Sequence, residues 1–234
     1  MAKITRICHA TFDDISYRFY FTGCPLQAGI WWISLEEILD NNKFQNAGTL
    51  ALKYLVEPRS SHPKREFWGI SSVGHLLVLA CCHRKPNTIG LWSSTLADGD
   101  TGSSRLLIEI CFNDELCSEI RLPFTPFRCT TFVTKSNSIG CWNVTIAIGD
   151  YTHSRLHFVG VRATKDQINR SMCRFEKRFE HIFATKGVQI GAVQNPDGLH
   201  FDPEGRLFVA DSGNLRIQAC LIHNHSFGES TTSF

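Results

Sequence analysis

The stretch from Asn195 to Ala219, NPDGLHFDPEGRLFVADSGNLRIQA, decides the fold that we expect for this chain. Residues 206–210 form a short apolar run with β-branched and aromatic side chains, and the segments on either side alternate apolar with polar residues. The tetrapeptides at 202–205 (DPEG) and 211–214 (DSGN) are rich in residues that favour tight turns. The pattern therefore predicts three short antiparallel strands joined by two tight turns.

Three such strands are most of one propeller blade. A single blade leaves both faces of its sheet exposed to water, so further copies are expected along the chain. Asp150 and Arg155 stand 61 residues before Asp211 and Arg216, each Asp lying five residues before its Arg between two apolar runs. A third copy at 67–92 has neither residue, and Cys81 stands where the Asp is expected. These copies predict a repetitive all-β chain.

The remaining segments are assigned by pattern. We expect outer strands at 104–112 and 175–184, with a helix over 165–180 as an alternative to the latter. In the N-terminal part, we expect strands at 17–23, 29–33 and 49–56, and a short helix at 34–40 with Ser34 as N-cap. The predicted organisation is therefore a degenerate blade or insertion in residues 1–60, followed by propeller blades in 61–234, with the best repeat at 195–220.

The pattern P-D-G-L-x-F-D-x-x-G-x-L-F-V-A-D-S-G-N-x-R-I-Q resembles the NHL repeat over about 26 residues. This resemblance implies a β-propeller of four-stranded antiparallel blades, of which the chain would hold about three to four, whether or not the ring is complete. NHL propellers are platforms for protein or RNA, most prominently at the C-terminus of tripartite-motif ubiquitin ligases. The implied context is a ubiquitin ligase or post-transcriptional regulation.

The signature residues of the repeat are expected to be structural. Asp211 is predicted to accept backbone N–H bonds in its own turn, and Arg216 to pair with a carboxylate or with carbonyls of a neighbouring blade. Gly205 and Gly213 are predicted to supply positive φ. The full set that we assign to the repeat is Asp150, Asp197, Gly198, Gly205, Asp211, Gly213, Asn214 and Arg216.

The sequence offers little for catalysis. No C-x₂-C pair suits a zinc finger among the 10 cysteines, and neither a G-x-S-x-G elbow nor a phosphate-binding loop occurs. A metal-dependent propeller enzyme of lactonase or lyase type is the alternative, with Asp197, His200 and Asp202 as ligands. The equivalent positions in the other copies carry poor ligands: Trp68, Ser71, Arg128 and Thr130. We therefore predict no enzyme, no metal and no cofactor.

Binding is the remaining function, through loops whose ends the scaffold fixes. The candidate anchors are Trp68, Arg128, Arg155, Arg174 and Arg178. A protein partner is favoured, and RNA is the alternative because of basic clusters at 162–165 and 170–178, although the net charge of +2 gives no strong electrostatic footprint. The start of the chain has no apolar signal segment and no run can span a bilayer, so we expect a cytoplasmic protein without membrane contact.

Overall fold

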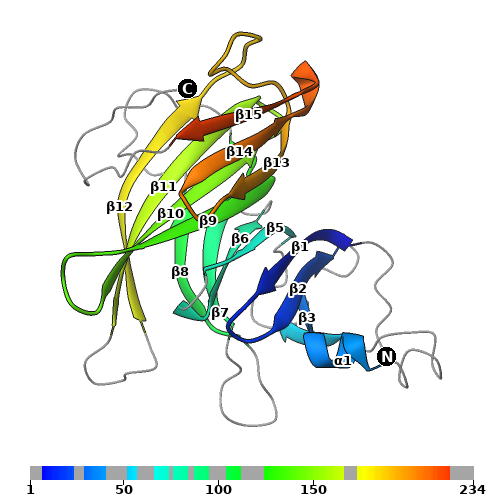
Figure 1. Ribbon diagram of the computed structural model, residues 1–234, viewed down its shortest axis with the longest axis vertical. Helices are drawn as coiled ribbons and strands as arrows, with labels where there is room; N and C mark the ends of the chain where they lie inside the picture. Colours follow the sequence, from blue (N-terminus) through cyan, green and yellow to red (C-terminus); the bar gives the residue numbers. More distant parts are fainter. Residues whose placement is uncertain are drawn as a thin grey trace. The chain divides into compact units, whose positions relative to one another are not determined.

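The computed structural model describes residues 7–23, 29–40, 52–56, 66–73, 76–83, 87–94, 104–111, 124–165 and 173–221, with only the backbone of Phe179. The described chain is all-β apart from short helical turns, as predicted, and has the fold of a β-propeller built of small antiparallel sheets (Figure 1). In each sheet the strands lie in the order in which the chain makes them, which is the topology of a propeller blade. By contacts the chain divides into two compact units, Met1–Glu109 and Ile110–Phe234.

The first unit holds two four-stranded sheets. The first sheet consists of β1 (Ile7–Asp13), β2 (Arg18–Gly23), β3 (Ile30–Ser34) and β4 (Lys53–Val56), and the second of β5 (Phe67–Ser72), β6 (Val78–His83), β7 (Thr88–Ser93) and β8 (Leu106–Cys111). Strands lie where they were expected in the N-terminal part and within 104–112, although residues 49–51 and 112 lie outside the described part. The strand β1 was not expected. A core of buried aromatic and aliphatic side chains joins the two sheets, among them Tyr20, Trp32, Ile70 and Trp92.

The predicted helix is α1 (Leu35–Leu39), which begins at Ser34 as expected. The Ser34 hydroxyl accepts a hydrogen bond from the Glu37 backbone N–H at 3.2 Å, and the Glu37 carboxylate accepts one from the Ser34 backbone N–H at 3.2 Å. This reciprocal pair is a capping box, and it satisfies two of the amide groups that a helix start leaves open. Lys53 on β4 adds an ion pair to Glu37 at 2.9 Å.

The second unit holds a four-stranded and a three-stranded sheet. The third sheet consists of β9 (Arg128–Lys135), β10 (Cys141–Asp150), β11 (Arg155–Lys165) and β12 (Cys173–Ala184), and the fourth of β13 (Pro196–Phe201), β14 (Arg206–Asp211) and β15 (Arg216–Leu221). The expected strand at 175–184 is β12, so the helical alternative is wrong from 173 onward, and residues 166–172 lie outside the described part. The two predicted turns and three strands of the best repeat are confirmed.

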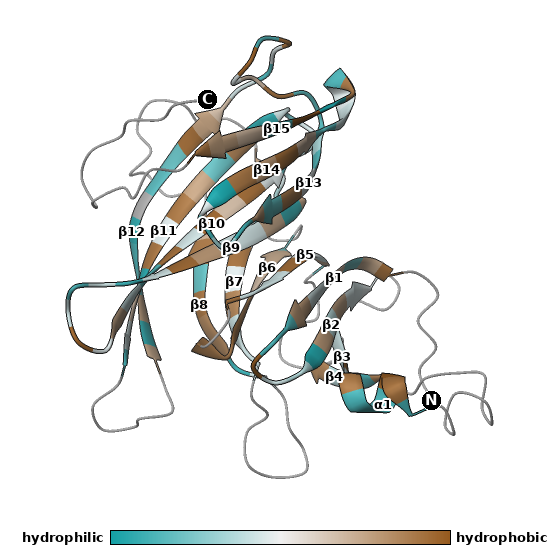
Figure 2. Cartoon of the chain, in the orientation of Figure 1, coloured by the Kyte–Doolittle hydropathy of each residue, from teal (hydrophilic) through white to brown (hydrophobic). Residues whose placement is uncertain are grey.

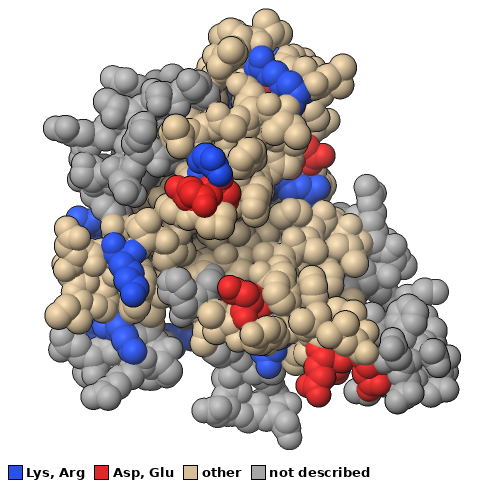
Figure 3. Space-filling model, viewed as in Figure 1, with Lys and Arg blue, Asp and Glu red and all other residues tan. Residues whose placement is uncertain are grey.

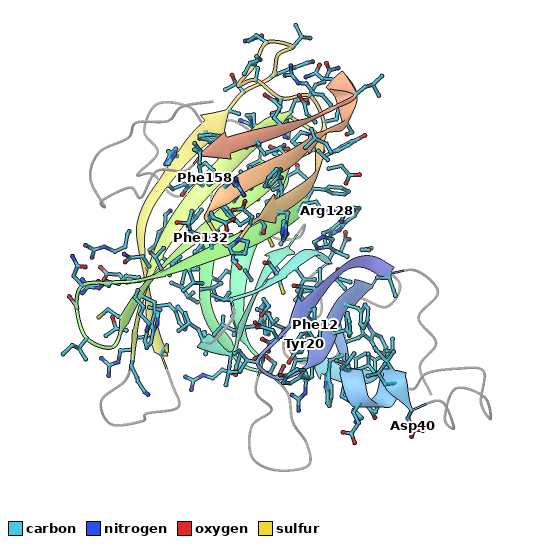
Figure 4. All side chains as sticks on the ribbon, viewed as in Figure 1. Phe12, Tyr20, Asp40, Arg128, Phe132 and Phe158 are labelled. Carbon is cyan, nitrogen blue, oxygen red and sulfur yellow. The ribbon has the colours of Figure 1, made fainter. Side chains whose placement is uncertain are left out.

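A core of apolar side chains lies between the third and fourth sheets. It contains Phe158, Phe201, Leu207 and Val209 with Phe132 packed against it; Phe132 and Phe158 are labelled in Figure 4. Brown and teal residues alternate along several of these strands in Figure 2, because successive side chains of a strand point to opposite faces.

The first strands of neighbouring sheets are joined by the same device in both units. The Thr11 hydroxyl on β1 accepts a hydrogen bond from the Ser72 backbone N–H on β5 at 3.1 Å. In the second unit, the Thr130 hydroxyl on β9 accepts one from the Phe201 backbone N–H on β13 at 3.3 Å. A threonine in the first strand therefore satisfies an amide that the ladder of the next sheet leaves open.

The predicted Asp–Arg spacing recurs as a cross-strand pair. Asp150 faces Arg155 and Asp211 faces Arg216, and a third pair, Asp13 and Arg18, closes the β1–β2 turn of the first sheet. In each turn the residue before the arginine has positive φ: Tyr17, Ser154 and Leu215, with φ of 51°, 54° and 54°. The sequence comparison missed the N-terminal pair, although its spacing is the same.

The second sheet replaces this pair by His83 and Thr88, which face each other across β6 and β7. The expected equivalence of Cys81 with the Asp is therefore wrong by two residues, because β6 continues to His83. The Trp92 indole N–H donates to His83 Nε2 at 3.1 Å, His83 Nδ1 lies 2.9 Å from the Thr88 hydroxyl, and that hydroxyl donates to Glu109 at 2.7 Å. Since an indole can only donate, His83 accepts at Nε2 and holds its proton at Nδ1.

The two turn glycines of the best repeat differ. Gly205 has φ of +82°, as predicted. Gly213 does not have positive φ; it lies in the 3-10 turn η3 (Ser212–Asn214), and Leu215 takes the left-handed conformation instead. Gly213 is needed for close approach, because a Cβ there would lie 2.5 Å from the Gln194 side chain while its N–H donates to the Gln194 carbonyl at 2.8 Å.

Candidate functional site: an apolar loop held by the Asp211–Arg216 turn

The Asp211 carboxylate is fully buried at the end of β14 and is surrounded by hydrogen-bond donors. It accepts bonds from the Gln194 backbone N–H, from the Asn214 amide and the Arg216 Nε at 2.8 Å each, and from the Gln218 amide at 3.0 Å. Burial alone would raise the pKa of Asp211, but the bonds from Asn214, Gln194 and Arg216 outweigh it and hold the pKa below its usual range. The residue is therefore an ionised anchor for the turn.

The Arg216 guanidinium links this turn to the preceding segment of the chain. It donates to the carbonyls of Val188 and Gln189 at 2.8 Å and of Ala192 at 3.0 Å. Arg216 thus pairs with a carboxylate, as predicted, and its carbonyl partners lie in the segment between β12 and β13 rather than in a strand of a neighbouring blade. The Asn214 amide adds a bond to the Gly187 carbonyl at 2.9 Å. We call residues 186–193 the clamped loop, because these side chains fix its backbone against the β14–β15 turn.

Four large aliphatic side chains are exposed on these two segments. Val188 and Ile190 of the clamped loop are 72% and 79% exposed, and Leu215 and Ile217 beside Arg216 are 94% and 75% exposed. We call this set the apolar rim; Figure 2 shows brown residues in the loop after β12 and at the start of β15. Such exposure contributes nothing to the core, yet the backbone beneath is held by hydrogen bonds. Exposed apolar groups gathered on a fixed backbone make this set a candidate for an interaction surface.

The predicted binding residues are not gathered in one place. Trp68 lies half-buried on β5 in the first unit. Arg155 is only 5% exposed, and its guanidinium donates to Asp150 at 2.9 Å, so it is part of a turn rather than an open anchor. Arg174 and Arg178 are exposed on β12, at the opposite edge of the third sheet from β9.

Arg128, which begins β9 and is labelled in Figure 4, is largely enclosed. Its side chain is 17% exposed; its Nε lies 3.4 Å from the Asp197 carboxylate, and its guanidinium stacks 4.3 Å from the ring centre of Phe127. The arginine therefore joins the third sheet to the fourth, and its pairing with Asp197 also occupies one of the carboxylates considered for a metal.

Asp202 is likewise paired, with Arg206, and His200 is exposed on β13. Within the described ranges, no three His, Cys, Asp or Glu side chains are grouped so that they could hold a metal ion. No helix among the described residues is long and apolar enough to cross a membrane.

Sequence reasoning missed the apolar rim. The signal that could have found it is local: Val188 and Ile190 lie between Gly187 and Gly191, where a glycine-flanked loop has no core to face. Leu215 precedes the signature Arg216 at a turn position, which is also an unusual place for a large apolar residue.

No family model and no curated protein matches the chain. Among solved structures, a chain of the crystal structure of a nidogen/laminin complex is similar at 16% identity, covering 91% of this chain and 59% of that one with a TM-score of 0.49. A structural genomics protein of unknown function from Bacteroides thetaiotaomicron is similar at 12% identity, covering 86% and 41%, with a TM-score of 0.47. This chain therefore spans less than two thirds of either neighbour.

Proposed function

We propose that this chain is a non-catalytic interaction platform that binds a protein partner through the apolar rim. The observation that carries the proposal is the exposure of Val188, Ile190, Leu215 and Ile217 on a backbone that Arg216 and Asp211 hold in place. A fixed backbone loses little freedom when a partner docks, so exposed aliphatic groups on it bind more favourably than the same groups on a free loop.

The chemistry of the rim favours protein over RNA. Single-stranded RNA is held by stacking aromatic or arginine planes and by free positive charge. The rim is aliphatic, and the guanidinium of Arg216 in its midst is already bound by one carboxylate and three carbonyls. We accordingly infer a partner that presents a complementary apolar surface.

The resemblance of residues 195–220 to NHL repeats supports a finer version of this proposal. In it, the chain is an NHL-type platform of the cytoplasm that serves a tripartite-motif-like ubiquitin ligase or a post-transcriptional regulator. RNA is the alternative ligand in that setting, and a metal-dependent propeller enzyme is the alternative activity.

The test is affinity capture from lysate with wild-type protein and with the double variant Ile190→Ser/Leu215→Asn, each with and without RNase. Asn is favoured over Leu in the left-handed conformation of residue 215, so this change is expected not to weaken the fold. The control is Leu39→Ser, which removes a comparably exposed leucine from α1 in the other unit.

We expect partners that resist RNase, stay with Leu39→Ser and are lost from the double variant. Retention of the same partners by the double variant would exclude the rim. Loss of all partners on RNase treatment would instead support the RNA alternative and make Arg128, Arg174 and Arg178 the first residues to replace.

A further inference from the structure

A second feature of the third sheet is a polar pocket near the β9–β10 turn, at the far end from the apolar rim. The ends differ because β12 begins at Cys173 opposite Lys165 and finishes at Ala184 opposite Leu156, just before the clamped loop. The pocket has a volume of 190 Å³ and is lined by Ser136, Ser138, Asn143, Arg162 and Arg178. Its walls therefore offer two guanidinium groups, an amide and two hydroxyls.

Arg162, on β11, is the unusual member of this set. It is half-buried, and among the described residues its side chain donates one hydrogen bond, to Cys141 Sγ at 3.6 Å, and forms no ion pair. Arg128, Arg155, Arg206 and Arg216, in contrast, all form ion pairs with carboxylates. Glu176 faces Arg162 across β11 and β12, but its ion pair is with Arg178. A half-buried guanidinium has five N–H donors to satisfy, and a thiol is a weak acceptor for one of them.

Two further observations concern the charge of the pocket. Its hydrogen bond is the main influence that lowers the pKa of the Cys141 thiol. Arg178 adds a second charge across the pocket, offset in part by Glu176, which it meets at 3.1 Å with both side chains well exposed. On the face shown in Figure 3, the end of the third sheet near the β9–β10 turn shows blue side chains and no red.

We propose that this pocket binds the phosphoryl group of a phosphorylated serine or threonine on a protein partner. A phosphoryl group brings a charge near −2 and three acceptor oxygens, which match two guanidiniums and their flanking donors. A carboxylate brings one charge and two oxygens, so it satisfies the pocket less well. The pocket has room for one such group rather than a track of successive phosphates, and the fully exposed Ile139 at the tip of the same turn offers an apolar contact to a peptide.

This inference rests on the proposed function only in taking the partner to be a protein. The pocket and the apolar rim share no residue, so each can be tested without the other. The probe for the pocket is a small molecule, N-acetyl-phosphoserine N-methylamide, whose binding does not depend on the rim.

The experiment titrates ¹⁵N-labelled full-length protein with this probe and follows the backbone amides of Ser138 and Asn143 by NMR. We expect saturable shifts, with an affinity at least tenfold higher than for N-acetyl-aspartate N-methylamide. Arg162→Gln should weaken binding at least tenfold, and Arg162→Lys, which keeps the charge but not the planar fork, should weaken it less. Arg206→Gln on β14, an exposed arginine elsewhere, is the charge-matched control and should bind as wild type.

Three results would overturn the inference. The first is equal affinity for the aspartate probe, which would indicate a site for any anion. The second is unchanged binding in Arg162→Gln with a spectrum that shows an intact fold. The third is displacement of the probe by an oligouridylate that binds more tightly, which would assign the pocket to nucleic acid. None of these changes the outcome expected for the apolar rim.

Discussion

Replacing Asp211 with alanine should release the clamped loop. The variant loses four hydrogen bonds to a buried carboxylate, and bonds to charged groups contribute about 1.5–3 kcal/mol each, less when they share one acceptor. Breaking a buried ion pair commonly removes about 3–5 kcal/mol. Arg216 is 28% exposed and retains its three carbonyl partners, so water and backbone compensate it in part. We therefore expect a loss of about 3 kcal/mol in the free energy of opening.

Hydrogen exchange read by mass spectrometry measures this locally. A loss of about 3 kcal/mol corresponds to roughly hundredfold faster exchange of the most protected amides in 206–221. Peptides from β6 and β7 in the other unit should be unaffected. The matched control is Asp202→Ala in the β13–β14 turn, whose carboxylate pairs with the exposed Arg206, and we expect a much smaller change in exchange there. Equal effects of the two variants would refute the role of Asp211 as an anchor.

Asp211 also predicts a pH effect, because its pKa is lower in the folded state than in the unfolded chain. A lowered carboxyl pKa stabilises the fold at pH values above the unfolded pKa, about 3.9, and this contribution is lost as the pH falls through the folded pKa. Acid unfolding of the second unit should therefore be steeper in wild type than in Asp211→Ala below about pH 4.

Three further predictions follow from buried groups. Burial and the nearby Arg155 lower the pKa of His157 to about 4, whereas the pKa in the unfolded chain is near 6.5. The free energy of unfolding should therefore fall by about 3 kcal/mol as the pH drops from about 6.5 to about 4. Urea titrations of His157→Gln should lose this pH dependence. Gly90→Ala places a Cβ against the His83 ring, so we expect a melting-curve loss of about 2 kcal/mol, and an unchanged curve would disprove the close approach. Burial raises the pKa of the Cys220 thiol to about 11, so iodoacetamide should label exposed Cys111 in the native protein and reach Cys220 only after denaturation.

The parts of the fold that the sequence predicted are the local ones. The strands and turns of residues 195–220 were expected because Pro, Gly and Asp determine a turn within a span of four residues, which the sequence alone shows. Asp150 and Arg155 were found for the same reason, since five residues fix their pairing. The length of β6 depends on its ladder with β7 instead, which is why the equivalence of Cys81 was wrong and His83 was overlooked.

The candidate sites were harder to predict, because the exposure and the ion pairing of a side chain depend on segments that are distant in the sequence. The sequence presents Arg155 as an available anchor, yet the side chain is buried and bound to Asp150 in its own turn. Arg162 looks like any strand arginine until the β9–β10 turn, β10 and β12 place donors around it, with no ion pair to it among the described residues. The glycine-flanked Val188 and Ile190 could have been noticed, but only Arg216 shows that their backbone is fixed.

The left-handed backbone at Leu215 would set the stability of the fold against the binding that we propose for the apolar rim. Glycine or asparagine suits this conformation, and leucine raises the energy of the native state by about 1 kcal/mol there while its side chain stays in water. Selection of a library of variants for heat resistance alone should therefore enrich asparagine or glycine at position 215. The selected variants should have higher melting temperatures and weaker binding to the partner. Selection for binding at moderate temperature should restore leucine at this position. A position at which the two selections favour different residues would therefore mark the binding surface.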